Sequence, residues 1–497
     1  MNAKISKFMA VAITAMFCIT AVAVFAVGED SSAADTTHKV YVEIINTDGT
    51  VDETGWVQFT SDSTAAGFVK EANKAFALYG YDAVFSAADS YITVTYGTSI
   101  NNATYSIVDG AWTAVTDTVA TYPAAAYLAL CLDNGYISTD VYNALEDADK
   151  ASWTFVNYGY GCDYIKVPEG KTSECPAAPE QISVNCYVEV VSAAGAVTET
   201  AWVEFDTLKT VRSFVANANE AFETADLDVE ASEGKYGVSI AYDGSGNCST
   251  YYGKDGKWVA VASGSTDYFN EYIGLAVGNG YIGKTVYDAL SADAKKAWKD
   301  TGYAGDYQYQ KIIDAEMTVN KTAINCFVEK VDEKGKVTES KWVEINAQKT
   351  NQSLIYNANK AFDAAGLEEL EMSKSKYGIG VTYDGSGNCS TYYAKDGKWV
   401  AVASSSTDYL NDEIALAVGN GYIGKTVYDA LSADEQKAWK DTGYTGDYQF
   451  QKIVTEPTDG YKPASSDNNN NTGLIIGVVV AVIVVIAIGA FVFYKKK

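Results

Sequence analysis

Histidine is almost absent from this chain, with His38 the single example among 497 residues. Ser-His and Cys-His catalytic devices need a histidine beside the nucleophile, and zinc sites use histidine or closely spaced cysteine pairs. The sequence has neither a histidine cluster nor a CxxC pair. We therefore interpret His38 as incidental and predict a protein that is not an enzyme and holds no cofactor.

Positive charge is also scarce: 37 Lys and Arg residues stand against 64 Asp and Glu residues, for a net charge of −27. Nucleic-acid binding needs clustered cationic side chains, so we exclude nucleic acid as a partner. Acidic residues are plentiful, yet no spacing singles out a carboxylate pair of the kind that cleaves glycosides. Because 47% of the residues are hydrophobic, the middle of the chain has a globular composition.

Prolines are few, and they mark boundaries. Five of the six lie between globular stretches or towards the C-terminal end: Pro168, Pro176, Pro179, Pro457 and Pro463. We therefore predict a linker at 168–182 and a polar stalk at 455–472, the latter containing four consecutive asparagines.

One unit is repeated between these boundaries. Trp202 recurs 140 residues later as Trp342, and the run 219–222 returns as 359–362. A diverged first copy supplies a similar run at 73–76. We predict three tandem homologous domains: repeat 1 at 38–167, repeat 2 at 183–313 and repeat 3 at 323–454.

The N-terminal end has the pattern of a secretory signal. Lys4 and Lys7 precede an apolar run, and acidic residues follow at once, which predicts a signal peptide over 1–27. The apolar run is also long enough for an uncleaved signal anchor.

The C-terminal end has the pattern of a membrane anchor. Residues 473–494 carry no charged side chain, and as a helix they would cross roughly 30 Å of hydrocarbon. The basic tail 495–497, formed by Lys495, Lys496 and Lys497, predicts a cytoplasmic C-terminus. Together the two ends predict a single-pass cell-membrane protein with extracellular repeats.

Cysteines come in pairs that appear and vanish together. Both members of a pair are present in repeats 2 and 3, whereas Val40 and Asn102 stand near the equivalent positions of repeat 1. A disulfide between them would close a loop of about 60 residues and contribute roughly 4 kcal/mol. The predicted disulfides are Cys186–Cys248, Cys326–Cys389 and, private to repeat 1, Cys131–Cys162. Cys175 would remain, either free or in an intermolecular bond.

Two kinds of modification or ligand site are suggested by short motifs. The Asn-x-Ser/Thr pattern predicts glycosylation at Asn102, Asn247, Asn320, Asn351, Asn388 and Asn470. Oxygen-bearing side chains alternate as in the first half of a calcium loop at Asp243, Ser245 and Asn247, and again at Asp384, Ser386 and Asn388. The pattern then fails, because Cys248 and Lys254 occupy the glycine and bidentate-acid positions, so a plain turn is the favoured interpretation and no metal is predicted.

Hydrophobic periodicity predicts an α+β domain. In repeat 2, alternation predicts a hairpin over 186–205, and a helix over 210–222 comes next, capped by Thr210. A strand at 236–242 and a second hairpin at 251–261 come after it. Three helices at 268–277, 285–290 and 292–299 and a closing strand at 307–312 complete the unit. We expect a mostly antiparallel sheet with segregated helices.

These patterns carry two resemblances. The Lys235-Tyr236-Gly237 and Gly256-Lys257-Trp258 steps resemble those of transcobalamin C-terminal-like β-β-α-β-β modules, over about half of each repeat. The order of signal, acidic repeats, Asn-rich stalk, single apolar helix and basic tail resembles the repetitive adhesin-like cell-surface proteins of archaea. That second resemblance implies a role in adhesion.

Tyrosine is abundant, with 37 copies. Five in repeat 2 recur in repeat 3: Tyr251, Tyr252, Tyr268, Tyr303 and Tyr307. Aromatic surface patches bind sugar rings and protein partners, although ordinary strand and core positions account for any single one.

These observations favour a surface protein that displays three extracellular domains for adhesion or cell-envelope interaction, with an unknown carbohydrate or protein ligand. The first alternative is a structural envelope spacer without a ligand. The second is a surface-tethered hydrolase or solute-binding receptor, which would require a deep pocket.

Overall fold

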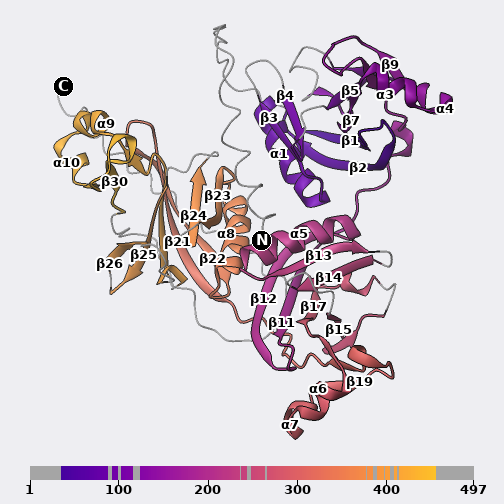
Figure 1. Ribbon diagram of the computed structural model, residues 1–497. Helices are drawn as coiled ribbons and strands as arrows, with labels where there is room; N and C mark the ends of the chain where they lie inside the picture. The colour runs from indigo at the N-terminus through magenta and orange to yellow at the C-terminus, as the bar shows by residue number, and fades with distance from the viewer. Residues whose placement is uncertain are drawn as a thin grey trace, which may run out of the picture. The chain divides into compact units, whose positions relative to one another are not determined.

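The computed structural model describes residues 35–454, apart from 88–91, 99–101, 116–123, 235–236, 243–247, 263–265, 376–377, 384–388, 397, 403–407 and 411–412. The fold is α+β and mostly sheet, and each repeat builds the same five-stranded main sheet (Figure 1). The predicted signal peptide, stalk, transmembrane segment and basic tail lie outside these residues. Among the described residues, no helix is long and apolar enough to cross a membrane.

Repeat 1 and the link after it contain these elements: β1 (Thr36–Ile45), β2 (Val51–Ser61), α1 (Ala65–Tyr79), β3 (Ala83–Ala87), β4 (Ile92–Tyr96), β5 (Ala103–Val108), β6 (Ala111–Ala114), β7 (Tyr127–Asp133), β8 (Tyr136–Ile137), α3 (Thr139–Ala144), α4 (Asp147–Lys150), β9 (Trp153–Phe155), β10 (Tyr164–Lys166) and η1 (Thr172–Glu174).

Repeat 2 contains β11 (Gln181–Val191), β12 (Val197–Leu208), α5 (Val211–Thr224), β13 (Val229–Gly234), β14 (Gly237–Tyr242), β15 (Ser249–Lys254), β16 (Lys257–Ala260), η2 (Asp267–Phe269), β17 (Tyr272–Gly278), β18 (Tyr281–Ile282), α6 (Lys284–Ala289), α7 (Ala292–Lys295), β19 (Trp298–Asp300), η3 (Gly305–Tyr307) and β20 (Tyr309–Lys311).

Repeat 3 contains β21 (Thr322–Val331), β22 (Val337–Ala347), α8 (Asn351–Ala364), β23 (Leu370–Ser375), β24 (Gly378–Tyr383), β25 (Ser390–Lys395), β26 (Lys398–Ala401), η4 (Asp408–Leu410), β27 (Glu413–Gly419), β28 (Tyr422–Ile423), α9 (Lys425–Ala430), α10 (Ala433–Gln436), β29 (Trp439–Asp441), η5 (Gly446–Tyr448) and β30 (Phe450–Lys452).

The chain divides into two compact units. One holds repeat 1 together with Asp206–Asn217, and the other holds the rest of repeat 2 together with repeat 3.

The three main sheets share one strand order, β2-β1-β7-β5-β6 in repeat 1, with β12-β11-β17-β15-β16 and β22-β21-β27-β25-β26 as its counterparts. The two central strands of each sheet run parallel, as in β1 with β7, β11 with β17 and β21 with β27. On one face of the sheet of repeat 3, Ile324, Cys326 and Val328 of β21 pack in the same core as Leu354 and Phe362 of α8. Because α8 presents an apolar stripe and is capped by the Thr350 hydroxyl, it forms where periodicity predicts.

A second core lies on the other face of each main sheet. In repeat 2 it joins Tyr251 of β15 and Ala276 of β17 to Ile282 and Trp298 of a small sheet with the order β18-β20-β19. The main sheet is therefore covered on both faces, by a helix on one and by the small sheet with its two short helices on the other.

This double coverage explains the main error in the sequence prediction. The stretch 268–277, predicted as a helix, forms the central strand β17 after a single 3-10 turn, η2. Its residues Ile273 to Val277 are all buried. A strand buried on both faces is apolar throughout and has no period-two signal, so its sequence resembles that of a buried helix.

Two smaller corrections concern the end of the repeat. The helix predicted at 292–299 stops at Lys295, and Trp298 begins strand β19. The closing strand is β20, and it pairs with β18 and β19 in the small sheet rather than with the main sheet. The hairpin predicted at 251–261 is confirmed as β15 and β16, and the Ser291 hydroxyl caps α7 by accepting from the Ala294 N–H.

The repeated asparagine of the Asn-x-Ala-Phe run is a bridge between helix and strand. Asn359 of α8 accepts a hydrogen bond from the backbone N–H of Met372 at 2.7 Å and donates one to its carbonyl at 2.9 Å. Asn219 makes the same two bonds to Ala231, and Asn73 makes them to Phe85. A half-buried amide that pairs both ways with one residue fixes the helix against the two-stranded sheet beside it.

Each closing strand is held by a buried ion pair. Lys311 of β20 lies 2.8 Å from Glu189 of β11, and Lys452 of β30 lies 3.1 Å from Glu329 of β21. In repeat 1 the corresponding pair is Lys166–Glu43, at 3.5 Å. The carbonyl of each of these lysines also accepts a hydrogen bond from a buried tyrosine hydroxyl: Tyr105, Tyr251 and Tyr392.

We expect Asn359→Ala to lower the free energy of unfolding by about 2 kcal/mol, because it removes both bonds to Met372. The exposed Asn346 of β22 is the control, and Asn346→Ala should change stability by less than about 0.5 kcal/mol. Urea unfolding of the two variants measures the difference, and equal stabilities would contradict a role for the bridge.

Candidate functional site

The loop between the last two strands of each repeat presents tyrosine to solvent. We call residues 155–164, 300–309 and 441–450 the tyrosine hairpins. In repeat 2, Tyr303 is 70% exposed and Tyr307 is 52% exposed. In repeat 3, Tyr444 and Tyr448 are 69% and 49% exposed. Each of these two loops therefore leaves two large aromatic side chains open to solvent.

Short-range hydrogen bonds hold the hairpin backbone. In repeat 2, the Asp300 carboxylate accepts from Gly302 N–H at 2.8 Å, and the Thr301 hydroxyl accepts from Tyr303 N–H at 3.1 Å. The same hydroxyl donates to the carbonyl of Tyr307 at 2.8 Å. These side chains replace backbone partners in the turn, so the loop has a defined shape.

The hairpin of repeat 3 has the same bonds at the same lengths. Asp441 accepts from Gly443 N–H at 2.8 Å, Thr442 accepts from Tyr444 N–H at 3.1 Å, and Thr442 donates to the Tyr448 carbonyl at 2.8 Å. Two copies of one rigid loop are therefore displayed by repeats 2 and 3.

Other aromatic rings support the exposed ones. The Tyr307 ring centroid lies 5.6 Å from that of Tyr281 on β18, and Tyr448 stands 5.6 Å from Tyr422 in the same way. In the same repeat, Tyr287 of α6 and Tyr309 of β20 are stacked at 3.7 Å. Contacts of this kind limit ring motion, so less conformational entropy is lost when a ligand covers the ring.

The first repeat keeps the feature in altered form. Tyr158, at the position of Tyr303, is 55% exposed and contacts Tyr136 at 5.8 Å. Tyr160 is fully exposed and adopts a positive φ of 53°. Phe155 is a further aromatic residue of this hairpin and is 58% exposed.

The structure sorts the tyrosines that the sequence singled out. Tyr251 and Tyr268 are buried and belong to the interior, and Tyr252 is half-buried. Tyr303 and Tyr307 alone of the five are exposed. Sequence reasoning missed Tyr158 and Tyr160 of repeat 1. Their signal was the position of Tyr158, five residues after Trp153, as Tyr303 is five after Trp298.

None of the predicted disulfides is formed in the structure, where all seven described cysteines are free thiols. Cys186 pairs with Ile273 on one side of β17, whereas Ser249, the neighbour of Cys248, pairs with Ala276 on its other side. An intervening strand separates the cysteines by about 10 Å across the sheet. A disulfide needs Cα atoms within about 7 Å.

The Cys326–Cys389 pair is separated in the same way. Strand β27 lies between Cys326 of β21 and Cys389 before β25. Cys131 is buried on β7 with its thiol 3.6 Å from the Lys166 carbonyl, while Cys162 lies in the tyrosine hairpin. Burial raises the pKa of the Cys131 and Cys186 thiols and raises that of Cys389 to about 12, which disfavours the reactive thiolate form.

The remaining predicted sites fall partly outside the described residues. All six calcium candidates lie there, as do glycosylation acceptors Asn247, Asn388 and Asn470. Among the described residues no group of acidic, His and Cys side chains could hold a metal ion. Of the described acceptors, Asn320 is exposed, the Asn102 amide donates to the Val94 carbonyl, and Asn351 accepts from the Tyr409 hydroxyl at 2.7 Å.

His38 is not incidental in the structure. It is fully buried on β1, where Nδ1 donates to the Ala125 carbonyl at 2.8 Å and Nε2 lies 2.9 Å from the Ser61 hydroxyl. Phe59 and Phe68 pack against its ring. Burial lowers the pKa of His38 from 6.5, although the bond to Ala125 opposes the change. The role is structural.

Thiol labelling checks the cysteine assignment. In the native protein, we expect Cys131, Cys186 and Cys326 to resist alkylation while Cys162 and Cys175 react. After unfolding without reductant, all seven should react. Mass spectrometry reads both states, and cysteines that label only after reduction would restore the disulfide prediction.

The pH dependence of stability checks His38. Because its folded pKa is lowered, the unfolded chain binds more protons, and the contribution of His38 is present above pH 6.5 and lost as pH falls below it. We expect the stability difference between wild type and His38→Gln to narrow between about pH 7.5 and 5. Urea unfolding across this range measures it, and a pH-independent difference would contradict the buried neutral ring.

Comparison with known proteins adds no relative. No protein-family model matches the chain, and no curated protein matches it.

Proposed function

We propose that this is a single-pass cell-surface protein that displays three tandem extracellular domains for adhesion or cell-envelope interaction, and that it is not an enzyme. The tyrosine hairpins are its contact points. The observation that carries the proposal is the pair of exposed tyrosines held on the same rigid loop in repeats 2 and 3.

The ends of the sequence support display at a surface. A signal-like segment at 1–27 would direct the chain across the membrane, and the apolar segment 473–494 with its basic tail would anchor it. Between the last repeat and that anchor, the polar residues 455–472 would hold the repeats away from the lipid surface.

Carbohydrate is the ligand class that the hairpins favour. A tyrosine ring offers a flat apolar face for a sugar ring and a hydroxyl at its edge for hydrogen bonding. Asp300 and Asp306 belong to the same hairpin as Tyr303, and the whole chain has a net charge of −27. An uncharged glycan fits this setting better than an acidic polysaccharide, which would be repelled.

Repetition would compensate for a shallow site. An exposed hairpin buries little ligand surface, so a single contact is weak, whereas linked contacts to one polymer gain from effective concentration. Repeat 1 supports this argument because it has diverged in sequence yet still exposes Tyr158 at the same place. The alternative function, a spacer without a ligand, would not require exposed tyrosine rings at equivalent positions.

Removal of the rings tests the proposal. In the full chain, Tyr303→Ala combined with Tyr444→Ala should weaken binding to a neutral-glycan array at least tenfold, since an aromatic contact contributes about 1 kcal/mol or more at each site. Val259→Ala combined with Val400→Ala is the matched control, because these residues are exposed at equivalent positions of β16 and β26. Unchanged binding by the tyrosine variant would exclude the hairpins, and no binding by the wild type would favour the spacer.

A further inference from the structure

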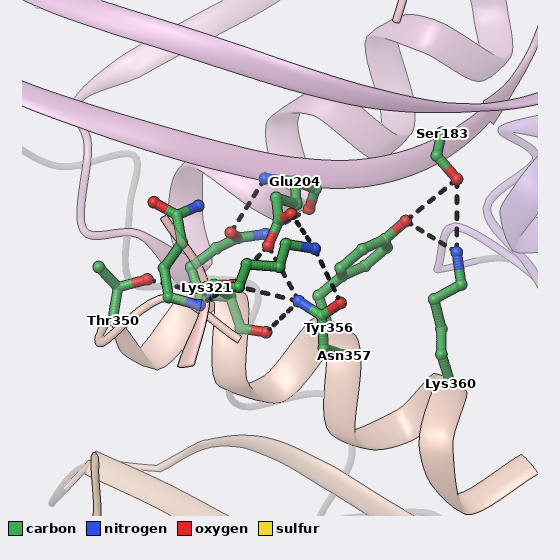
Figure 2. Close-up of polar contacts among 10 residues, drawn as sticks. Ser183, Glu204, Lys321, Thr350, Tyr356, Asn357 and Lys360 are labelled. Carbon is green, nitrogen blue, oxygen red and sulfur yellow. Dashed lines mark hydrogen bonds and ion pairs between the residues drawn. The ribbon is translucent and has the colours of Figure 1, made fainter. Parts of the chain in front are cut away.

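A buried carboxylate lies where repeats 2 and 3 meet. Glu204 of β12 is only 2% exposed, and its carboxylate lies 2.6 Å from the Lys321 ammonium (Figure 2). The same carboxylate accepts hydrogen bonds from the Ser353 hydroxyl and, at 2.9 Å, from the Asn357 amide. Each of these partners comes from the start of repeat 3 or the link just before it, and together they compensate the loss of water around the charge.

The backbone of Glu204 is bound as well. Gln352, the second residue of α8, accepts from the Glu204 N–H at 3.0 Å and donates to its carbonyl. Strand β12 is an edge of its sheet, so one side of it has no strand partner among the described residues. The Gln352 amide therefore occupies a position that another strand would take.

Further contacts extend the junction on both sides. Tyr356 and Lys360 reach the Ser183 hydroxyl of β11, each at 3.4 Å (Figure 2). Lys374 of β23 pairs with Asp226 and donates to the Glu223 carbonyl at 2.9 Å, at the end of α5. Repeat 3 thus contacts the hairpin and the helix end of repeat 2.

The equivalent glutamate of repeat 3 identifies the cause of the burial. Glu344 follows Trp342 and Val343 as Glu204 follows Trp202 and Val203. Glu344 is exposed. The two sites share residue type, strand and neighbours, so the burial of Glu204 comes from the next repeat in the chain.

The donors Ser353 and Asn357 have counterparts in repeat 2, which also follows another repeat, but none in repeat 1. Ser213 and Asn217 of α5 stand at the positions of Ser353 and Asn357, and both donate to the Leu78 carbonyl at the end of α1. In repeat 1 the equivalent residues are Gly67 and Glu71. A side chain at 67 would clash with the Asp62 carboxylate, which occupies the space that a Cβ would need.

We propose that the first two turns of the helix after each hairpin form a docking surface for a preceding copy of the same repeat. Its signature is Ser-x-x-x-Asn, and Glu204 is the acceptor that locks repeats 2 and 3 into one body. Repeat 1, with Gly67 and Glu71, lacks the signature and is the N-terminal cap of the array.

Paired glutamate variants of the full chain test the lock. We expect Glu204→Ala to increase the rate of proteolysis in the link 314–321 about tenfold, because Lys321 and α8 lose their acceptor. Glu344→Ala, the same change at the open position, should leave that rate unchanged. Equal rates for the two variants would overturn the proposal.

A double variant separates docking from a local loss of stability in repeat 2. If Glu204 acts through Asn357, the Glu204→Ala and Asn357→Ala variant should be cleaved no faster than Glu204→Ala alone. Fully additive effects would show that the residues act separately and would overturn the lock. Neither result depends on whether the tyrosine hairpins bind glycan.

Discussion

The parallel pairing at the centre of each main sheet is the constraint on which the rest of the repeat depends. Strands β11 and β17 lie side by side, although more than 70 residues separate their paired positions, such as Val188 and Leu275. A parallel pair needs a crossover, and here the helix, the two-stranded sheet and the β15-β16 hairpin all lie within it. Both faces of the pair must then be covered, which places a helix on one side and the small sheet on the other.

The buried ion pair links the small sheet to that centre. Taking a lysine and a carboxylate out of water costs several kcal/mol, which the pair recovers only if further bonds satisfy both groups. In repeat 2, Lys311 contacts Glu189 and also donates to the Ile312 carbonyl at 2.9 Å, so the ammonium has more than one acceptor. The last strand therefore has one favourable position. Because the tyrosine hairpin leads directly into that strand, the ion pair also sets where the exposed rings are presented.

Patterns among neighbouring residues predicted the local helices and hairpins. The elements that the sequence did not predict depend on contacts between residues far apart in the chain. The hairpin β11–β12 and the helix α5 can be predicted from period and from the Thr210 cap, which depend only on neighbouring residues. Strand β17 was missed because burial on both faces removes the alternation that identifies a strand.

The cysteine and site predictions show the same limit. Cys186 and Cys248 of repeat 2 have counterparts together in repeat 3, but shared occurrence does not make a contact, and the strand order keeps them apart. The sequence names Tyr303 and Tyr307 among five recurring tyrosines but does not single them out as a site, because core and surface tyrosines recur equally. The core tyrosines and the exposed tyrosines differ in burial, which the structure shows and the sequence does not. No sequence signal distinguished Glu204 from Glu344, because the difference arises from the repeat that docks on Glu204.

The glycine at position 67 has a consequence for how such a chain can lengthen. Residues 275–293 are identical to 416–434, which indicates a recent internal duplication. A further copy inserted behind repeat 1 would bring its own serine and asparagine and meet an acceptor on the repeat before it. A copy placed ahead of repeat 1 would meet Gly67 and Glu71, which cannot supply the serine and asparagine donors. The array can therefore grow in only one direction, away from its N-terminal cap and towards its C-terminal end.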